Sequence, residues 1–385
     1  MEVRKLYYED SHLHTFTAKV TGCTPVVGGF SVTLEATAFY PEGGGQACDT
    51  GILGDVQVLS VTEENGQVLH LCDGPLAVGA EVTGRVDWER RFDLMQQHSG
   101  EHMVSGIIHR RYGHHNVGFH MGKDVITIDF DGPIPIEDLP AIESKVNNVI
   151  WADIPFRCWY PAAEELAQLP YRSKKALQMP VRLVEIPGVD LCACCGTQVQ
   201  RSGEVGLVKL LSCVKFHEGV RIEMVCGERA FRLLNQSYEQ NKLVSQAFSA
   251  KPDQTGEAAR RMNEALATEK FRVTALQKRL FAVLADHYRG KDFTLHFEPG
   301  LNSSAIRELA DAMANTCATA AVLSGSDEDG YGLCIISHTR DTRVLGGAAT
   351  QALNGRGGGK PEAFQGSLRA TRQEIEAFFS TLEIP

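Results

Sequence analysis

The sequence of 385 residues predicts a globular protein of two or three domains, because 43% of the residues are hydrophobic and 22% are charged. This composition excludes a disordered chain and a fibre. The 48 acidic residues outnumber the 38 basic ones and give a net charge of −10, so nucleic acid binding requires a local basic patch.

Membrane insertion and export are not expected for this sequence. No apolar run approaches the length of about 18 residues that a transmembrane helix needs. The first residues, MEVRKLYYED, carry charges where a signal peptide is apolar. The 11 cysteines are spread through the chain, which favours free thiols or metal ligands over a disulfide framework. We therefore expect a cytoplasmic protein with no membrane partner.

The predicted fold class is α+β with several domains. Residues 1–88 contain short segments of alternating polar and apolar residues, separated by Gly and Pro, at 29–36, 56–61 and 82–86. This pattern is typical of a small β-barrel or sandwich. A long helix follows over residues 88–112, with Asp87 as its N-cap and Gly113 as its stop signal.

Residues 89–227 are predicted to form an α+β domain. Besides the long helix, this domain has a second helix at 137–151 and strands at 125–130, 181–186 and 220–225. Residues 228–289 contain two helical stretches, 228–248 and 256–288, around the break SAKPDQT. They predict a helical hairpin or coiled-coil linker, which either joins domains or makes a dimer contact.

Residues 290–385 are predicted to form a small α/β domain. The expected strands are 293–297, 320–324 and 332–337, and the expected helices are 303–317 and 371–382. Between them lies a glycine-rich stretch whose backbone we expect to be flexible. The segment from His338 to Gln373 contains six basic residues and only two acidic ones. Two of the basic residues, Arg356 and Lys360, lie within GRGGGKPEAFQGS. A basic patch on a flexible backbone suits phosphate contacts along a nucleic acid, although a solvated loop is an equal alternative.

Two histidines in QHSGEHMVSG give the strongest local indication of chemistry. His98 and His102 are four residues apart on the predicted helix, so both imidazoles leave the same face. This arrangement suits two ligands of one tetrahedral zinc ion. The same string fits the H-x-x-E-H pattern of a zinc peptidase, with Glu101 as general base. The third ligand decides whether the site is that of a peptidase. A peptidase of this type needs a carboxylate as third ligand, so a thiolate in that place argues against it.

Three cysteines, Cys192, Cys194 and Cys195, lie close together in DLCACCGTQVQRSGEVG and can supply one soft zinc ligand. Two histidines and one thiolate leave the fourth position open, as in catalytic zinc sites. Water bound there has its pKa lowered to about 7, which predicts hydrolysis.

A glycine triplet, Gly43, Gly44 and Gly45, lies in TAFYPEGGGQACDTG and lets the backbone pass close to another group. A plain turn is the simpler interpretation of such a triplet. Thr37, Gln46 and Asp49 flank it and can hydrogen-bond a small polar ligand.

The strings TAFYPEGGGQ, HSGEH, CCGT…RSGEVG and GRGGGKPEAFQGS resemble, in this order, the editing half and C-terminal domain of alanyl-tRNA synthetase. No aminoacylation domain precedes them, so the chain resembles a free-standing AlaX protein of the long class. The resemblance implies a deacylase that removes serine or glycine from wrongly charged tRNA(Ala). It also links the C-terminal domain to tRNA binding, and with the helical region to a homodimer.

Carried over by position, the resemblance implies Zn²⁺ on His98, His102 and Cys194. The family's last ligand, a histidine, falls on Gln198. The fourth position then holds water, the Gln198 carbonyl or a neighbouring thiol such as Cys192. This departure keeps a second hypothesis open, a tRNA-binding module with an impaired editing site.

The resemblance also assigns candidate catalytic and substrate-binding residues. Thr37 is expected to bond the serine hydroxyl, and a site built to hold a hydroxyl rejects alanine by roughly 10⁴-fold. Gln46 matches the glutamine of the family's GGGQ string, and Gly43 to Gly45 approach the terminal adenosine or the ester. Glu101 either shuttles protons or pairs with an arginine. His120 either lines the pocket or is a core histidine.

Overall fold

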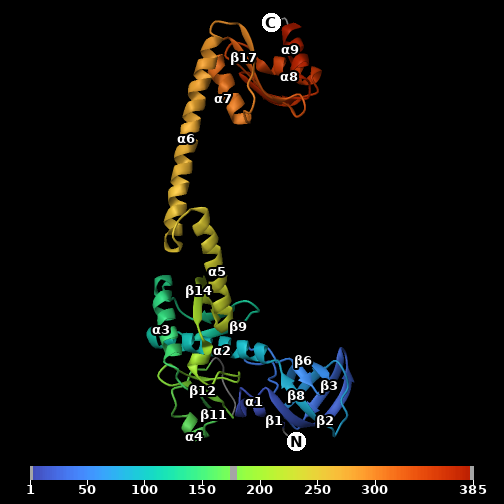
Figure 1. The fold of residues 1–385 in the computed structure, drawn as a ribbon, viewed down its shortest axis with the longest axis vertical. Helices are drawn as coiled ribbons and strands as arrows, with labels where there is room; N and C mark the ends of the chain where they lie inside the picture. Colours follow the sequence, from blue (N-terminus) through green and yellow to red (C-terminus); the bar gives the residue numbers. More distant parts are fainter. Residues whose placement is uncertain (1–2, 174–179, 382–385) are drawn as a thin grey trace. The chain divides into compact units, whose positions relative to one another are not determined.

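The computed structural model describes residues 3–173 and 180–381, which form two compact units, residues 1–243 and 244–385 (Figure 1). Each unit is built around its own hydrophobic cores. In the described part of the chain, no helix combines the length and the apolar character that crossing a membrane requires.

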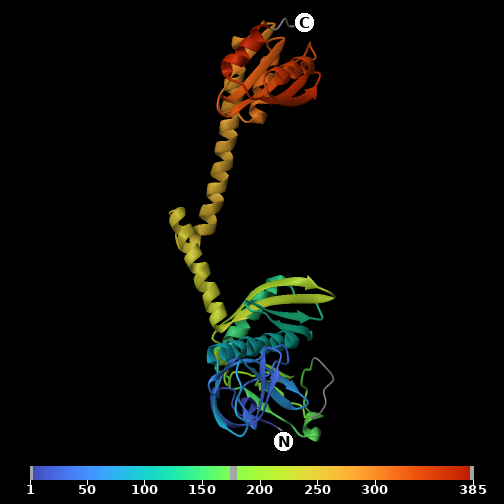
Figure 2. The same ribbon diagram turned by 90° about the vertical axis from the view of Figure 1, so that its right-hand side faces the viewer.

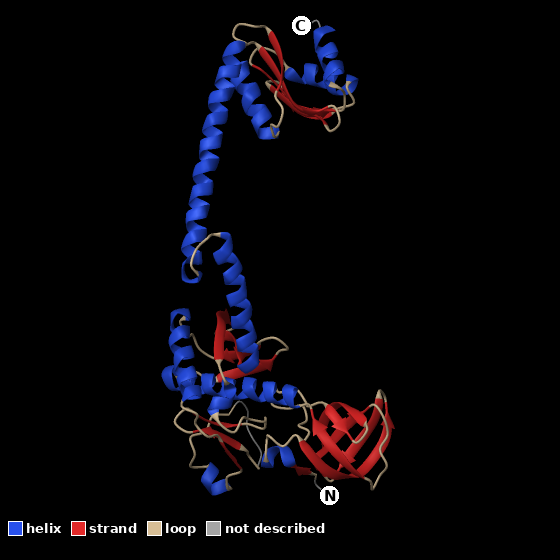
Figure 3. Cartoon of the chain, viewed as in Figure 1, coloured by secondary structure: helices blue, strands red, loops and turns tan. Residues whose placement is uncertain are grey.

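The first unit begins with a closed β-barrel (Figure 3). Its strands run in the order β2 (Thr15–Val26), β3 (Gly29–Leu34), β7 (Gln67–Cys72), β6 (Val56–Glu64), β5 (Gly51–Leu53) and β8 (Glu81–Val86). Alternate residues point inward, as Phe16, Ala18 and Val20 do on β2. The short elements β1 (Arg4–Lys5), α1 (Leu6–Glu9) and β4 (Ala36–Thr37) complete this part, with β1 and β4 paired in parallel.

The long helix α2 (Trp88–Tyr112) follows the barrel and begins and ends where the sequence predicts. The Asp87 side chain accepts from the backbone N–H of Arg90, and Gly113 ends the helix with a φ of 77°. Most of the residues of α2 are buried, so the helix is enclosed on several sides rather than exposed along one face. Polar side chains on this helix are therefore held in the interior of the unit.

A four-stranded sheet covers α2 (Figure 2). Its order is β14 (Val208–Phe216), β15 (Gly219–Cys226), β10 (Ile126–Phe130) and β9 (Asn116–Met121). Helix α3 (Leu139–Trp151), which a 3₁₀ turn (Ile136–Asp138) precedes, packs into the same core and confirms the predicted second helix.

A smaller sheet completes the first unit. It contains β11 (Arg157–Trp159), β12 (Leu183–Ile186) and β13 (Asp190–Ala193), all antiparallel to their neighbours. The helix α4 (Ala163–Leu166) lies between β11 and β12 in the chain, and a 3₁₀ turn (Ser202–Val205) precedes β14. Strand β13 leads directly into the cysteine-rich segment.

The helix α5 (Gly227–Ala247) crosses the boundary between the two units. A 3₁₀ turn (Pro252–Gln254) and the helix α6 (Thr255–His287) then open the second unit. Several apolar side chains on α6 are exposed, including Phe271 and Leu276. The helical hairpin and the homodimer stay predictions.

The second unit is a five-stranded sheet with a hydrophobic core on each face. Its order is β16 (Phe293–Phe297), β17 (Thr319–Ser326), β18 (Gly330–Ser337), β20 (Ala363–Leu368) and β19 (Arg356–Lys360). Helices α6 and α7 (Ser303–Ala314) cover one face, and α8 (Thr342–Ala352) and α9 (Arg372–Thr381) cover the other. The predicted end of the last helix, residue 382, lies outside the described residues.

The glycine-rich stretch of the second unit forms regular secondary structure, so the expectation of a flexible backbone was wrong. Residues 342–352 form helix α8, and RGGGK forms strand β19, antiparallel to β20. A Cβ atom on Gly359 would lie 2.1 Å from the Ala363 carbonyl oxygen, so the glycines permit close pairing of the two strands.

Candidate functional site

The helix α2 brings His98 and His102 together in the interior of the first unit. Their rings are stacked with centroids 5.3 Å apart, and both residues are 2% exposed. The spacing of four residues places them on one helix face, as expected from the sequence.

Cys194 meets the two histidines from the segment after β13. Its Sγ atom lies 3.3 Å from His98 Nε2, and the ligand atoms of His98, His102 and Cys194 all lie within 4.8 Å of one another. Tetrahedral zinc with Zn–N of about 2.0 Å and Zn–S of about 2.3 Å separates N and S by ~3.5 Å. The three side chains therefore have the chemistry and spacing of a zinc-binding set.

Both imidazoles are oriented by a second hydrogen bond, at Nδ1. Gln46 Oε1 accepts from His98 Nδ1 at 2.9 Å, and Asp190 Oδ2 accepts from His102 Nδ1 at 3.0 Å. Arg172 holds Asp190 through two bonds of 2.7 and 2.8 Å. Because Nδ1 donates in each ring, Nε2 is the nitrogen left for a metal, which is the usual arrangement around metal-binding histidines.

The ionisable groups of the cluster interact strongly with one another, and a metal ion has to displace a proton from His102 before it binds there. Burial lowers the pKa of His102, but the negative charge of Cys194 and the hydrogen bond to Asp190 outweigh burial and raise this pKa to about 10. Burial also raises the pKa of Cys194, but His98 and His102 lower it well below its ordinary value. Cys194 is therefore a thiolate, the form that binds metals.

Gln198 does not join the ligand atoms through its carbonyl, contrary to one of the sequence-based alternatives. Its Oε1 accepts from Ser99 Oγ at 2.7 Å, and its Nε2 lies 3.8 Å from Cys194 Sγ and donates to it. The same Ser99 Oγ accepts from the N–H of Val199. Gln198 thus presents a donor, not a ligand, to the cluster.

Cys192 lies close to His102. It groups with His102 and Asp190, and burial raises the pKa of its thiol. A neutral thiol is a poor ligand, so Cys192 is not favoured as the fourth one.

The glycine triplet forms a tight turn against the cysteine-rich segment. Gly43 and Gln46 exchange backbone hydrogen bonds, and Gly44 and Gly45 have φ values of 61° and 84°. A Cβ atom on Gly44 would lie 2.8 Å from Cys195 Sγ, and one on Gly45 would lie 2.9 Å from Phe119 Cδ1. Glycine is therefore required for this close approach, which brings Gln46 to His98.

Thr37 lies in the barrel interior, and the predicted contact with a substrate hydroxyl has no support in this geometry. It is fully buried, its hydroxyl donates to His70 Nε2 at 2.9 Å and accepts from the N–H of Phe39. Because His70 Nδ1 donates to the Val32 carbonyl, Nε2 is the acceptor in the first bond.

Glu101 and His120 also lie away from the cluster's open side. Glu101 is 2% exposed, and its carboxylate accepts from Ser105 Oγ and Asn116 Nδ2. His120 is exposed on β9, so it is not a core histidine, and it does not line the cavity, whereas its neighbour Phe119 does. The thiolate ligand and the enclosed Glu101 both argue against the peptidase alternative.

A cavity of about 740 Å³ opens above the cluster. Its lining includes His98, His102, Cys194, Gly44 and Gly45, as expected, whereas Gly43 and Gln46 are not part of it. Sequence reasoning missed further lining residues, namely Lys5, Tyr8, Glu63, Tyr160 and Arg182. No local motif marks them. Asp190 was also missed, although its position two residues before Cys192 could have identified it.

Comparisons with known proteins show which family the chain belongs to. Residues 7–90 match the model of class II (A) tRNA synthetases, residues 181–223 the second additional domain of threonyl and alanyl tRNA synthetases, and residues 281–383 the DHHA1 domain. The chain is 30% identical to the alanyl-tRNA editing protein Aarsd1 of Rattus norvegicus over 97% of this chain and 96% of that protein. The chain belongs to the family of alanyl-tRNA editing proteins.

The chain is also similar to other proteins related to alanyl-tRNA editing proteins and alanyl-tRNA synthetases. Identity to Aarsd1-A of Xenopus laevis is 31%, covering 91% of this chain and 87% of that protein. Identity to the alanine–tRNA ligase of Thermofilum pendens is 32%, covering 99% of this chain but 44% of the ligase. The solved C-Ala domain of Aquifex aeolicus alanyl-tRNA synthetase matches 24% of the chain at 20% identity, with a TM-score of 0.21 that is too low to argue from.

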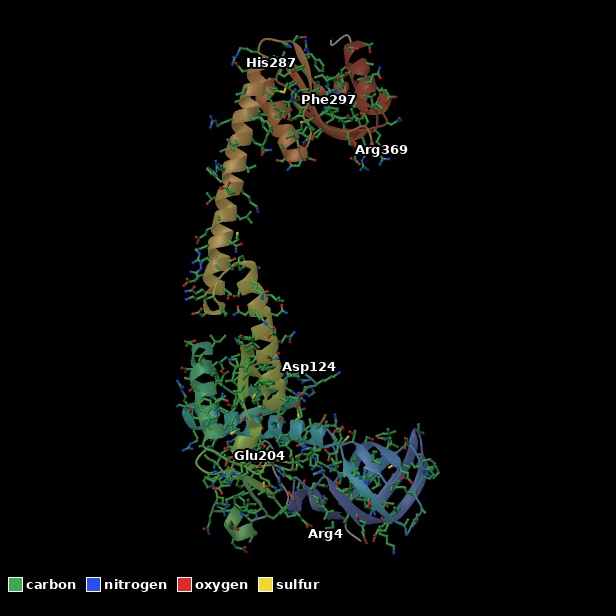
Figure 4. The ribbon with its side chains drawn as sticks, in the orientation of Figure 1. Arg4, Asp124, Glu204, His287, Phe297 and Arg369 are labelled. Atoms are coloured by element: carbon green, nitrogen blue, oxygen red, sulfur yellow. The ribbon has the colours of Figure 1, made fainter. Side chains whose placement is uncertain are left out.

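The edge strand β19 of the second unit carries two basic residues. Arg356 and Lys360 are exposed at the two ends of β19, and neither has an ion-pair partner among residues 3–173 and 180–381. Arg356 and Arg369 line a cavity of about 590 Å³, and Figure 4 shows Arg369 at the surface of this unit.

Proposed function

We propose that the protein is a trans-editing hydrolase that cleaves the aminoacyl ester of tRNA(Ala) wrongly charged with serine or glycine. The observation that carries the proposal is the convergence of His98 Nε2, His102 and Cys194 Sγ at the floor of an open cavity. Membership of the alanyl-tRNA editing family supplies the substrate class. Such a substrate implies work in the cytoplasm, where tRNA is charged and used.

In this proposal His98, His102 and Cys194, which all line the cavity, would hold a Zn²⁺ ion. Bound zinc supplies Lewis-acid polarisation of a carbonyl group and increased acidity of a water molecule. The reaction consumes one water molecule, breaks the bond between the acyl carbon and the ribose oxygen, and returns a free amino acid and a ribose hydroxyl.

The protein's own residues hold this arrangement in place. Gln46 and Asp190 fix which nitrogen of each imidazole carries the proton, so that neither ring has to change tautomer. Gln198 donates to the Cys194 sulfur and thereby stabilises its negative charge. The turn at Gly44 and Gly45 keeps the cavity wall close to the cluster without side chains that would fill it.

Arg356 and Lys360 are proposed to contact tRNA phosphates. Both are exposed cations on the edge strand of the sheet, in a chain of net charge −10. Phosphate contacts supply affinity without reading sequence, so this part serves to retain the tRNA rather than to select it.

The test combines metal content with deacylation of Ser-tRNA(Ala). Purified protein is expected to hold one zinc per chain and to release serine. Cys194→Ala is expected to lose most of the bound zinc and most of the serine release. Cys158 is an exposed thiol on β11 outside the cluster, so Cys158→Ala is expected to retain both properties. Serine release that persists in metal-free protein would contradict the proposal.

A further inference from the structure

Part of the cavity lining is aromatic and is separate from the metal-ligand candidates. Tyr8 on α1 and Tyr160 after β11 both line the cavity, with ring centroids 6.3 Å apart and planes 73° apart. Tyr160 is 49% exposed, so much of its ring is open to a ligand.

Tyr8 and the neighbouring Arg182 are hydrogen-bonded to the backbone of the segment that carries the candidate metal ligand Cys194. The Tyr8 hydroxyl donates to the Cys195 carbonyl oxygen at 2.8 Å, one residue beyond Cys194. The Arg182 guanidinium lies 4.8 Å from the centre of the Tyr8 ring and donates to the carbonyl oxygens of Cys194 and Gly196, both at 3.0 Å. The aromatic wall and the cluster are thus held in one fixed relation.

The size of the cavity exceeds what an amino acid needs. Its volume of about 740 Å³ falls in the range of roughly 300–1,000 Å³ typical of sites for drug-sized ligands. A seryl or glycyl group occupies a small part of it, so a second part of the substrate has to fill the remainder.

The polar groups of the rim also suit a base. Lys5 and Glu63 line the same cavity and form an ion pair of 2.6 Å, with side chains 25% and 32% exposed. They place a donor and an acceptor side by side, and the edge of a nucleobase presents both kinds of partner.

We propose that Tyr160 and Tyr8 form a stacking platform for the purine base of the nucleoside that carries the aminoacyl ester. Aromatic rings and arginine planes are the usual surfaces on which unpaired bases stack. This inference rests on the proposed function for the position of the ester, but it concerns a separate contact. The base is held on the tyrosines while the ester lies at the cluster.

The test measures affinity without hydrolysis. The probe is 3′-serylamino-3′-deoxyadenosine, whose amide replaces the ester, and its partner is the same molecule with hydrogen in place of adenine. Calorimetry on the zinc-loaded full chain is expected to show the adenine compound binding at least about tenfold more tightly. Alanine substitution of a stacking aromatic weakens binding by roughly 5- to 100-fold per base.

Tyr160→Ala is therefore expected to bind the adenine compound roughly 5- to 100-fold more weakly, and to bind the base-free compound with nearly unchanged affinity. Tyr160→Phe keeps the ring and retains most of the affinity. Tyr238→Ala is the matched control, because Tyr238 is 60% exposed on α5 and lies outside the cavity.

Equal binding of the two compounds, or an equal loss of both in Tyr160→Ala, would overturn the platform. Failure to bind either compound would overturn it as well. Serine release from Ser-tRNA(Ala) is measured in parallel. Hydrolysis without base-dependent binding refutes only the platform, whereas base-dependent binding without hydrolysis supports the platform and refutes the proposed function.

Discussion

Single side chains decide how the two imidazoles face the cavity, and Gln46 is the clearest case. Its Oε1 accepts from His98 Nδ1 and from the N–H of Thr197, and its Nε2 donates to Thr197 Oγ1. All of these bonds are buried. Gln46 is therefore a positioning residue for His98 rather than a group that contacts substrate.

Gln46→Ala is expected to lower the zinc affinity of the protein by roughly 10- to 100-fold, because a residue that hydrogen-bonds a metal ligand typically contributes this much to metal affinity. The measurement is competition for zinc with a chelator. Gln57→Ala, at an exposed position on β6, is the matched control. Unchanged affinity in Gln46→Ala would show that His98 needs no such support.

His70 gives the barrel a dependence on pH. Burial lowers its pKa to about 4, whereas an unfolded histidine has a pKa of about 6.5. The unfolded chain thus binds the proton first as pH falls, and stability present above pH ~6.5 is lost progressively down to pH ~4. At pH 5 the loss is on the order of 2 kcal/mol.

The check is an NMR titration of the His70 ring together with urea unfolding at pH 7 and pH 5. His70→Gln can keep the bonds to Val32 and Thr37 but does not titrate. It should therefore show a smaller loss of stability between the two pH values. A ring that titrates near 6.5 in the folded protein would refute this account.

At the scale of elements, the turn from Gly43 to Gln46 joins the barrel side of the unit to the cysteine-rich segment. Gly45→Ala would place a methyl group 2.9 Å from the Phe119 ring at a φ of 84°. We expect a loss of about 1–3 kcal/mol in stability and at least a tenfold loss of deacylation, because Phe119 packs against His98.

Gly66→Ala separates backbone strain from this contact. Gly66 has a similar φ of 78°, but a Cβ atom there would meet nothing within 4 Å. Thermal unfolding and serine release of the two variants are compared. If Gly66→Ala lost as much activity as Gly45→Ala, strain alone would explain the effect and the contact with Phe119 would be irrelevant.

Local signals predicted elements well, and contacts between distant segments poorly. The helix α2 could be predicted with its ends because Asp87 and Gly113 act within one turn. The bond between Gln46 and Thr197 could not, since 151 residues separate them. The same limit explains Thr37, whose partner His70 lies 33 residues away inside the barrel.

The strand β19 shows a different limit of sequence reasoning. A run of glycines has low strand propensity, so the sequence gives no sign of a strand at RGGGK. Its pairing depends on β20 and on space that only glycine leaves beside the Ala363 and Gln365 carbonyls. Arg356 and Lys360 are consequently held on a fixed edge rather than on a flexible segment.

At the scale of the whole molecule, the chain is acidic, and so is the tRNA that it is proposed to bind. We propose that the contact is made by the basic edge strand β19, which carries Arg356 and Lys360. Arg356→Ala with Lys360→Ala is expected to weaken tRNA binding and to lower the salt dependence of log K by about 2, or about 1 for each phosphate contact. The control is Lys19→Ala with Arg85→Ala, two exposed cations on the barrel. Filter binding at several salt concentrations measures both slopes, and an unaltered slope in the β19 variant would refute the contact.

The most direct test of the whole account is deacylation by zinc-quantified protein of Ser-tRNA(Ala), with Ala-tRNA(Ala) and Ser-tRNA(Ser) as controls. The account predicts rapid release of serine from the first substrate and little release from the other two. No release from Ser-tRNA(Ala) despite one bound zinc per chain would contradict it, and tRNA binding without catalysis would then be the remaining function.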